Sequence, residues 1–388
     1  MKYNFDVSID RRGTGALKWD IPEGELPMWV ADMDFETAPE IRETIAARAA
    51  HGVFGDNIVP DEWYDAYISW WRTRHGFELR RDRLVFSTGV VPALSSAVRK
   101  LTTPAERVLL LTPCYNIFYN SILNNGRVPL ECPLVYEDNR YHIDFELLES
   151  QLKQPQTTLM ILCNPHNPVG KIWSKEELEK IGVLCKANNV IVISDEIHCD
   201  LTAPGKSYIP LASVSETCRD ISVTCIAPTK TFNLAGLQTA AVYAENELLF
   251  NRMNRALNTD EVAEPGSFAV TAAVAAFTKG AEWLDALRDY IEENRRTVAE
   301  YITSEIPGIT YVPSEATYLL WLYCGRLCEN TTDLAREIRS ETGLYLSAGT
   351  GYGAGGERFL RLNIACPRET VLDGLDRLKR GINGYKTR

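Results

Sequence analysis

Short apolar runs alternate along the first two thirds of the chain with segments that show helical spacing. The runs cover residues 107–111, 159–163, 189–196 and 221–227. Nearly continuous apolar runs are typical of parallel strands that are covered on both faces. An amphipathic segment, 175–188, separates two of them. Because strands and helices that alternate in this way build a parallel sheet between helical layers, the pattern predicts an α/β fold.

The chain from residue 267 onward shows a different pattern. Two helices are expected first, at 267–277 and 283–305, and the second is long and charged. Beyond them, strands are expected at 309–312, 318–323 and 358–364, and helices at 333–342 and 368–382. This mixture is typical of a separate α+β unit.

Two further helices are predicted near the N-terminus. Residues 39–51 carry apolar side chains at helical spacing, and Asp61 is placed to cap the next helix. That second helix has four aromatic side chains on one stripe: Trp63, Tyr67, Trp70 and Trp71. Such a stripe is typical of a protein core or of a subunit interface, and the pattern alone leaves both open.

Chemically distinctive residues follow the predicted strands, each at a carboxyl end. They are Gly89, Tyr115, Asn167, Asp195 and Lys230. In sheets of this class, ligands bind at the carboxyl ends of strands. Gly89 also opens a helix, and a strand, a glycine and a helix start together aim free backbone N–H groups at an anion. The sequence therefore predicts that these five residues meet in one binding site.

Lys230 has no other charged residue within several positions on either side. It lies between the apolar run 221–227 and a small apolar turn that contains Gly236. Burial disfavours the charged form of an amine, so we expect the pKa of Lys230 to fall. A lowered pKa is what an amine needs to form a Schiff base. A surface lysine at a strand end would have the same neighbours, so this stretch alone leaves both interpretations open.

The composition excludes several classes of function. The chain has 388 residues and a net charge of −11, so neither nucleic acid nor an anionic membrane surface is an expected partner. The N-terminus lacks the apolar core of a signal peptide, and no apolar run approaches the ~18 residues that cross a bilayer. Ten scattered cysteines fit a reducing, cytoplasmic compartment. Cys324 and Cys328 lie close together, but no further ligand cluster joins them, so no metal site is expected.

A glycine-rich segment at 349–356 shares its composition with dinucleotide fingerprints. That fingerprint follows a strand and opens a helix, whereas these glycines lead into the predicted strand 358–364. We therefore interpret the segment as a flexible loop and not as a nucleotide site.

Three motifs resemble those of pyridoxal-phosphate (PLP) enzymes of the aminotransferase class I/II superfamily, fold type I. They are Asn-Pro-His-Asn-Pro at 164–168 followed by Gly170, Asp-Glu at 195–196, and the Lys230 segment. Their order and approximate spacing are those of the family over nearly the whole chain. Residues 29–35, 230–233 and 361–368 are more narrowly similar to the MalY/PatB branch, whose members are carbon–sulfur β-lyases of the cystathionine β-lyase type.

The resemblance implies an architecture, a cofactor and an assembly. The large domain, residues 46–285, would hold a mostly parallel seven-stranded sheet between helices, and residues 1–45 and 286–388 would form a smaller α+β domain. PLP would bind at the carboxyl edge of the sheet, and a small amino acid would be the substrate. Two copies would form a homodimer with the active site at their interface, which the aromatic helix near Trp63 would suit.

The family's roles pass to the matching residues. Lys230 would hold the cofactor covalently and later carry the α-proton of the substrate. Asp195 would keep the pyridine nitrogen protonated, so that the ring acts as an electron sink. Asn167 would donate to the ring oxygen, and Tyr115 would stack on the ring. His198 either serves the same oxygen or is a satisfied core histidine.

The anionic phosphate of the cofactor would bind at the start of the helix near residue 90. The resemblance assigns it to the backbone N–H groups of Gly89, Val90 and Val91, with help from the Thr229 hydroxyl.

The substrate would be bound by other residues. Arg361 would clamp its α-carboxylate, which suits a planar guanidinium. A backbone group near Ala31 would meet the ligand at the lip of the site. Arg368 is the competing arginine, but its place after Cys-Pro at a helix start favours a structural role.

Three positions depart from the family's pattern. Asp56 stands where relatives commonly place a tyrosine that reaches the partner's phosphate, and an ionised carboxylate would be repelled there. Either Asp56 turns away, or Asn57, Tyr64 or another group replaces the contact. Ala227 and Gln238 stand where many superfamily members carry a serine and an arginine. These departures bear on cofactor affinity and not on the type of reaction.

The expected reaction is an α,β-elimination that cleaves cystathionine or a related cysteine S-conjugate to a thiol, pyruvate and ammonia. Transamination of an α-amino acid is the alternative, because both reactions begin with removal of the α-proton. A non-catalytic cofactor-binding protein is a third alternative, and the presence of Lys230, Asp195 and Arg361 argues against it.

Overall fold

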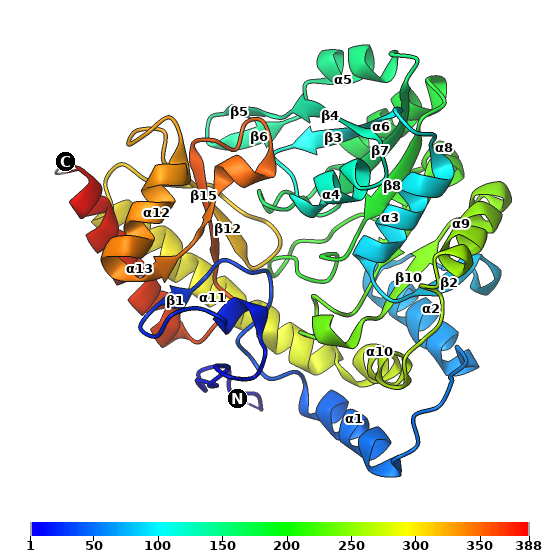
Figure 1. The fold of residues 1–388 in the computed structure, drawn as a ribbon, viewed down its shortest axis with the longest axis horizontal. Helices are drawn as coiled ribbons and strands as arrows, with labels where there is room; N and C mark the ends of the chain where they lie inside the picture. Colours follow the sequence, from blue (N-terminus) through cyan, green and yellow to red (C-terminus); the bar gives the residue numbers. More distant parts are fainter. Residues whose placement is uncertain (1, 387–388) are drawn as a thin grey trace.

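The structure is a computed structural model, and it describes residues 2–386. Its centre is a seven-stranded sheet with the order β2-β10-β9-β8-β7-β3-β4 (Figure 1). Strand β10 runs antiparallel to both neighbours, and the other pairs are parallel. The strands are β2 (Leu84–Ser87), β3 (Arg107–Thr112), β4 (Val128–Pro133), β7 (Thr157–Cys163), β8 (Ile191–Asp195), β9 (Ser222–Ile226) and β10 (Ala240–Tyr243). The predicted mostly parallel α/β architecture is confirmed.

Apolar side chains cover both faces of this sheet, because successive residues of a strand point to opposite sides. In β3, Leu109 and Leu111 belong to one buried cluster, whereas Val108 and Leu110 belong to another. The first cluster is closed by α5 (Phe145–Leu152), α6 (Lys175–Ala187), α7 (Leu211–Val214) and α8 (Glu216–Ile221). The second is closed by α3 (Val90–Leu101), α4 (Ile117–Leu123) and α9 (Glu247–Thr259).

A smaller antiparallel sheet has the order β11-β12-β15-β14. Its strands are β11 (Thr310–Tyr311), β12 (Leu319–Tyr323), β14 (Ser347–Ala348) and β15 (Phe359–Asn363). The neighbouring helices are α11 (Ala281–Glu305), α12 (Thr331–Thr342) and α13 (Arg368–Lys386). The domain limits near residues 45 and 285 stay a prediction, and both positions lie inside helices, the first in α1 (Pro39–His51) and the second in α11.

The aromatic stripe lies inside the chain's own core. Helix α2 (Asp61–His75) packs against α10 (Ser267–Lys279), and Phe277 of α10 contacts three of its aromatic rings. None of the four stripe residues is more than 2% exposed: Trp63, Tyr67, Trp70 and Trp71. Side chains so deeply buried cannot contact a second copy, so the core alternative is confirmed and the subunit-interface alternative is wrong.

The predicted cap of α2 is also wrong. Asp61 is the first residue of the helix, and the capping position is taken by Pro60 without a side-chain hydrogen bond. Because Asp61 already has helical geometry, its carboxylate acts as a negative charge in the first turn, where it faces the positive end of the helix.

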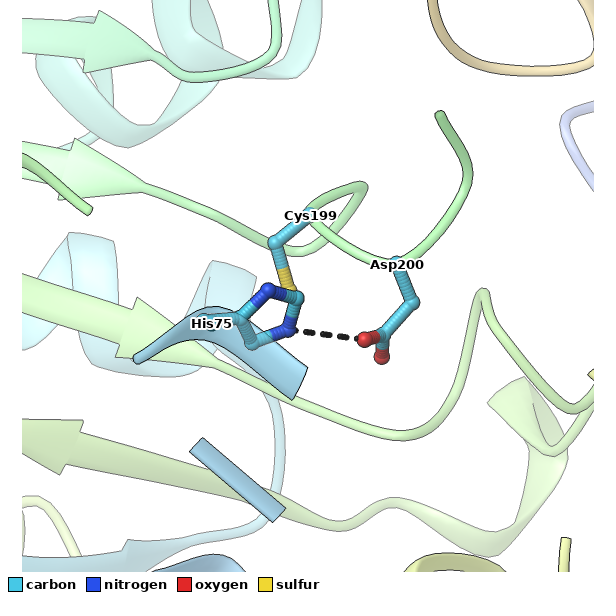
Figure 2. A group of neighbouring side chains, drawn as sticks. All are labelled: His75, Cys199 and Asp200. Atoms are coloured by element: carbon cyan, nitrogen blue, oxygen red, sulfur yellow. Dashed lines mark hydrogen bonds and ion pairs between the residues drawn. The ribbon is translucent and has the colours of Figure 1, made fainter. Parts of the chain in front are cut away.

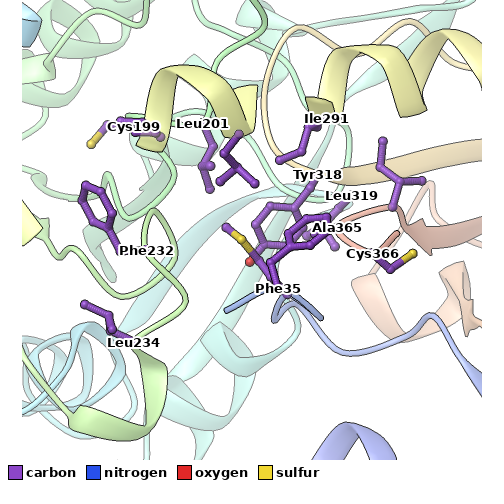
Figure 3. Packing of buried hydrophobic residues seen from close by; sticks show 14 of the residues in the cluster. Phe35, Cys199, Leu201, Phe232, Leu234, Ile291, Tyr318, Leu319, Ala365 and Cys366 are labelled. Carbon is purple, nitrogen blue, oxygen red and sulfur yellow. The ribbon is translucent and has the colours of Figure 1, made fainter. Parts of the chain in front are cut away.

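The two sheets are joined by a buried apolar cluster and by the N-terminal segment. In that segment, strand β1 (Leu26–Pro27) pairs with β13 (Leu344–Tyr345). Strands β5 (Val135–Glu137) and β6 (Arg140–His142) form a separate two-stranded hairpin. Figure 3 shows how residues from four remote segments pack in this cluster: Phe35, Phe232, Ile291, Tyr318 and Leu319. None of the helices within residues 2–386 combines the length and apolar character that crossing a bilayer requires.

Candidate active site

A cavity of about 240 Å³ opens at the carboxyl edge of the seven-stranded sheet. Ten of the residues that the sequence singled out line it: Ala31, Gly89, Val90, Val91, Tyr115, Asn167, Asp195, His198, Thr229 and Lys230. The eleventh, Arg361, donates a hydrogen bond from Nη1 to Oδ1 of Asn167 at 3.2 Å. Parallel strands end at the same edge of a sheet, so residues that are remote in sequence meet there.

Lys230 lies in the turn that follows β9. Its Nζ donates to the carbonyl oxygen of Ala31 at 2.5 Å. Burial lowers the pKa of Lys230 to about 8; the nearby Arg361 acts in the same direction, and the carboxylates of Asp32 and Asp195 oppose it. An amine that is partly neutral near pH 7 can act as a nucleophile and as a base.

Asp195 is the last residue of β8. Its Oδ1 accepts a hydrogen bond from the backbone N–H of Ile197 at 3.2 Å. Burial raises the pKa of Asp195 to about 7, and the adjacent Glu196 adds to this rise, whereas Lys230 opposes it. A cation placed in the cavity beside this carboxyl group would restore its ionised form.

Glu196 is held outside the cavity by four hydrogen-bond donors. They are the hydroxyl groups of Ser194 and Tyr208, the backbone N–H of Leu211 and, at 3.5 Å, the Asn164 side chain. Burial raises the pKa of Glu196, and these donors oppose the rise. Asp195 and Glu196 are therefore neighbours with separate surroundings, and only Asp195 faces the cavity.

His198 lines the cavity three residues after Asp195. Burial, with the positive charges of Lys230 and Arg361, lowers the pKa of His198 to about 3, so the ring is neutral at pH 7. Its Nδ1 is buried and has no hydrogen-bond partner within residues 2–386. A satisfied core histidine would have one, so this nitrogen is free to bond a ligand in the cavity.

The N-terminus of α3 forms one end of the cavity. Gly89 precedes the helix, and Val90 and Val91 belong to its first turn, where backbone N–H groups have no partner within the helix. A Cβ at position 89 would lie 3.1 Å from Cδ of Pro92, so the close approach favours glycine. The Thr229 hydroxyl borders the same space. Together with the positive end of the helix, these groups suit an anion.

The three departures from the family's pattern lie in different surroundings. Ala227 is fully buried in the core, and Gln238 is an exposed residue on the rim of the cavity. Gln238 has a φ of +53°, which is uncommon for a residue with a side chain. Asp56 is exposed in the loop 52–60, where it lines a separate groove with Glu264. Within this chain, Asp56 therefore does not reach the cavity.

Arg361, on β15, keeps donors free although it is buried. Its Nη2 donates to the carbonyl oxygen of Trp29 at 2.7 Å, and its guanidinium lies over the ring of Tyr352 at 4.9 Å. Because arginine has five N–H donors, several remain for a carboxylate, including a buried Nε that has no partner in the described chain. Arg368 instead pairs with Glu293 outside the cavity.

The segment 28–35 is held across the cavity by asparagine side chains. Asn363 donates to the carbonyl oxygens of Val30 and Asp32 at 2.6 and 2.7 Å. Asn233, three residues after Lys230, donates to the carbonyl oxygens of Met33 and Phe35, both at 3.0 Å. The carbonyl of Ala31 is thereby fixed beside the lysine.

A buried ion cluster supports the same segment. Asp34 accepts from Lys18 and from Arg11, both at 2.7 Å, and from Nε1 of Trp19 at 2.8 Å. Arg11 also pairs with Asp32 at 2.7 Å. This cluster places the Asp32 carboxylate where it influences the pKa of Lys230.

His75, Cys199 and Asp200 form a compact group next to the Lys230 turn, with their potential ligand atoms within 4.8 Å of one another (Figure 2). Both oxygens of Asp200 already have donors. Nε1 of Trp70 and Nε2 of His75 lie 2.9 Å from one oxygen, and the Thr231 hydroxyl lies 3.0 Å from the other. Burial would raise the pKa of Asp200, but these hydrogen bonds outweigh burial and lower it. Since Thr231 follows Lys230, Asp200 anchors the lysine turn to α2.

Three residues that support the site from behind the cavity lining were not predicted from the sequence. Asp32 acts on the pKa of Lys230, Tyr318 bonds the carbonyl of Ala31, and the ring of Tyr352 lies against Arg361. Tyr352 lies in the glycine-rich segment, which is a short 3-10 helix followed by a turn into β15. This segment is closely packed, because a Cβ at Gly349 would lie 2.1 Å from the carbonyl oxygen of Gly356. No local pattern marks these three residues, since only the fold brings them next to Lys230, Ala31 and Arg361.

Similar proteins share the whole length of this chain. The model of the aminotransferase class I and II family matches residues 28–378. Cystathionine β-lyase PatB of Bacillus subtilis (strain 168) is 42% identical over 387 residues, which cover 98% of this chain and 100% of the relative.

Solved structures agree with this match. Cystalysin from Treponema denticola, which contains a PLP cofactor, is 30% identical with a TM-score of 0.95, over 99% of this chain and 100% of that chain. A PLP-bound C–S lyase from Staphylococcus hominis is 32% identical with a TM-score of 0.92, over 98% of each chain. The chain belongs to the aminotransferase class I and II family, and within its fold type I to the MalY/PatB branch.

Proposed function

We propose that this protein is a PLP-dependent carbon–sulfur β-lyase. Its substrate would be cystathionine or a related cysteine S-conjugate. An α,β-elimination would release the thiol, and hydrolysis of the remaining product would give pyruvate and ammonia. The observation that carries the proposal is the 42% identity to cystathionine β-lyase PatB over 98% of the chain. The cavity supports it with an amine at Lys230, a carboxyl group at Asp195 and a guanidinium at Arg361.

The unsatisfied groups of the cavity fit PLP. Asp195 is a buried carboxyl group that a protonated pyridine nitrogen would ionise. The unpartnered Nδ1 of His198 and the side chain of Asn167 suit the ring oxygen. The N-terminus of α3 and the Thr229 hydroxyl suit the phosphate, and Lys230 would form the covalent bond.

The bound cofactor supplies an electron sink for the substrate carbon that loses its α-proton. The chain's own residues bind the substrate and move the proton. Arg361 binds the α-carboxylate and so restricts the orientation of the substrate. Lys230 accepts the α-proton, because a pKa of about 8 leaves part of the amine neutral at pH 7. Asp195 balances the positive charge of the ring nitrogen.

The decisive experiment mixes the purified holoenzyme with cystathionine and no keto acid. A lyase releases pyruvate and ammonia continuously, because elimination regenerates the enzyme without a second substrate. An aminotransferase stops after one turnover until an amino acceptor is added. Activity that depends on added keto acid would reject the lyase in favour of transamination.

The substitution Lys230→Ala tests the covalent anchor. We expect this variant to lose the visible absorbance of the lysine-bound cofactor and to release no measurable pyruvate. Lys230→Arg is the matched variant, since it keeps a positive charge but cannot form the bond. A wild-type visible spectrum in either variant would contradict the assignment.

We further propose that two copies form a homodimer in the cytoplasm. The loop 52–60 exposes Val53, Phe54 and Ile58 by 64, 53 and 80%. Apolar side chains that are exposed together mark an interaction surface. The ten cysteines are free thiols, nine of them buried, which suits a reducing compartment.

A further inference from the structure

We propose that Tyr318 is a further positioning residue of this active site. Its hydroxyl holds the carbonyl of Ala31 in place. This carbonyl accepts a hydrogen bond from the Lys230 amine whenever the amine is not bonded to the cofactor. The inference rests on the proposed function, because that function requires the amine of Lys230 to leave the cofactor and to return in every turnover. Ala31 and Tyr318 would then form a fixed resting place for the amine.

The geometry shows one acceptor shared by two donors. The carbonyl oxygen of Ala31 lies 2.5 Å from Nζ of Lys230 and 3.1 Å from the hydroxyl of Tyr318. A carbonyl oxygen has two lone pairs, so both donors are accommodated at once. Tyr318 is wholly buried, and Figure 3 shows its ring within the apolar cluster between Phe35 and Leu319.

The shared acceptor matters when Lys230 moves. As the amine turns from Ala31 to the cofactor, the carbonyl loses its shorter hydrogen bond. Tyr318 keeps a donor on the carbonyl in both positions of the lysine. Without the hydroxyl, the covalently bonded position would leave the carbonyl without a protein donor, and an acceptor left unsatisfied away from water is costly. The Tyr318 hydroxyl therefore favours the state in which Lys230 holds the cofactor.

The Tyr318 hydroxyl donates a hydrogen bond and takes no part in proton transfer. Burial raises the pKa of Tyr318, and the neighbouring carboxylate of Asp32 adds to the rise. The phenol consequently stays protonated throughout the pH range in which Lys230 titrates. Because the Tyr318 hydroxyl donates in both states of Lys230, it keeps the Ala31 carbonyl in one position.

The backbone next to Tyr318 is strained and is held in place on three sides. Thr317 has a φ of +68°, which is a rare conformation for a β-branched residue. Its N–H donates to the carbonyl of Leu201, its carbonyl accepts from Nη2 of Arg295, both at 2.7 Å, and its hydroxyl accepts from the N–H of Leu319. Strain of this kind persists where the surroundings fix it, often at functional sites. Here it directs Tyr318 toward Ala31.

The test compares Tyr318→Phe with Tyr290→Phe. Each variant loses one hydroxyl from a buried tyrosine, but the Tyr290 hydroxyl bonds Asp6 and the N–H of Arg368, outside the cavity. Each holoenzyme is dialysed, the retained PLP is read from the visible absorbance, and PLP is then titrated back. We expect the apparent Kd for PLP to rise about tenfold in Tyr318→Phe and to stay unchanged in Tyr290→Phe. With cystathionine, kcat should fall severalfold at an unchanged KM.

Each outcome decides one question. Wild-type PLP retention in Tyr318→Phe would overturn the role of Tyr318, and so would an equal loss in both variants, because that would indicate a general packing effect. A wild-type enzyme that binds PLP but releases no pyruvate overturns the lyase, while the retention test of Tyr318 still stands.

A second variant guards against misfolding of Tyr318→Phe. Thr317→Gly keeps the Tyr318 hydroxyl but relieves the strain at φ +68° and removes the Thr317 hydroxyl that accepts from the N–H of Leu319, so the backbone that carries Tyr318 is held less tightly. We expect PLP retention to weaken about threefold. Retention equal to that of the wild type would overturn the positioning role.

Discussion

Burial acts in opposite directions on the two ionisable groups at the centre of the cavity. It lowers the pKa of Lys230 to about 8 and raises the pKa of Asp195 to about 7. The shifts share one cause, since a poorly hydrated site penalises whichever form is charged. An amine and a carboxyl group that both titrate near neutrality are typical of a site that performs proton transfer.

The rate at which the PLP-depleted protein captures PLP should follow the neutral form of Lys230. We predict that this rate rises with pH, has a midpoint near pH 8 and is level above it, because only the neutral amine attacks the aldehyde. At pH 7 the neutral fraction is on the order of 100-fold larger than that of an ordinary lysine. Stopped-flow absorbance measures the rate. A rate that still climbs at pH 10 would show that burial does not lower this pKa.

Two arginines close in sequence should differ sharply in their effect on substrate binding. We predict that Arg361→Lys raises KM for cystathionine about 30-fold, near 2 kcal/mol, because an ammonium cannot make two parallel hydrogen bonds to a carboxylate. Arg368→Lys is the control, since Arg368 pairs with Glu293 outside the cavity. Steady-state kinetics of the two variants compares them directly, and a larger KM effect at Arg368 would reverse the assignment.

Residues on motifs were predictable, and residues placed by packing were not. Asp195 ends a recognisable strand, and Asn167 and Lys230 each follow one. Parallel strands end at one edge, so their meeting follows from the pattern. Tyr318 bonds Ala31, and Asp32 acts on the charge of Lys230, through contacts between segments more than 190 positions apart. Such contacts depend on how the small sheet and the N-terminal segment pack, which no local pattern records.

At the scale of elements, the turns after β8 and β9 are braced against one helix. Asp200 connects the first turn to His75 and Trp70 of α2, and to Thr231 in the second turn. A buried carboxylate with three donors is stable in place, and its removal leaves all three donors unsatisfied. The Lys230 turn therefore depends on a residue that does not line the cavity.

We predict that Asp200→Ala lowers the free energy of unfolding by about 3 kcal/mol, because it strands buried donors from Trp70, His75 and Thr231. Urea unfolding at saturating PLP measures the change. Glu149→Ala is the control, because Glu149 forms an exposed ion pair with Lys153 that contributes little to stability. Equal losses in the two variants would mean that the Asp200 group does not brace the turns.

Strands with a clear apolar pattern were predictable, including β11, β12 and β15 of the small sheet, whereas β4 and β10 of the large sheet were not. Strands β3, β7, β8 and β9 lie within two residues of their predicted limits. Strand β4 was missed, because Pro129 and Pro133 interrupt its pattern; proline is tolerated there since β4 is an edge strand. Strand β10 was also missed. It has four residues, two of them alanine, which has a low preference for strands.

At the scale of the whole molecule, the active site lies where the two sheets meet. Asp195 ends a strand of the large sheet, and Lys230 lies in the turn after another of its strands. Arg361 belongs to the small sheet, and Ala31 to the N-terminal segment that crosses between them (Figure 1). The α/β class followed from the alternating pattern. The crossing of the N-terminal segment did not, because residues 28–35 owe their place to the side chains of Asn233 and Asn363.

The proposed homodimer can be tested at the exposed loop 52–60. Ile58 is 80% exposed, so within a single chain Ile58→Asp should change stability by about 0.5 kcal/mol or less. If the loop packs on a second copy, the buried charge would instead disrupt the dimer. We predict that light scattering of this variant gives the mass of one chain, 43.6 kDa, at micromolar concentration.

Cofactor retention offers a second test of the proposed homodimer. A loop that closes on the partner's cavity would slow the loss of PLP, so Ile58→Asp should release PLP faster while its melting temperature stays close to that of the wild type. Leu372→Asp is the control, because Leu372 is 44% exposed on α13, remote from α1 and the loop in Figure 1. A control that dissociates equally, or an Ile58 variant that stays dimeric, would place the interface elsewhere on the molecule.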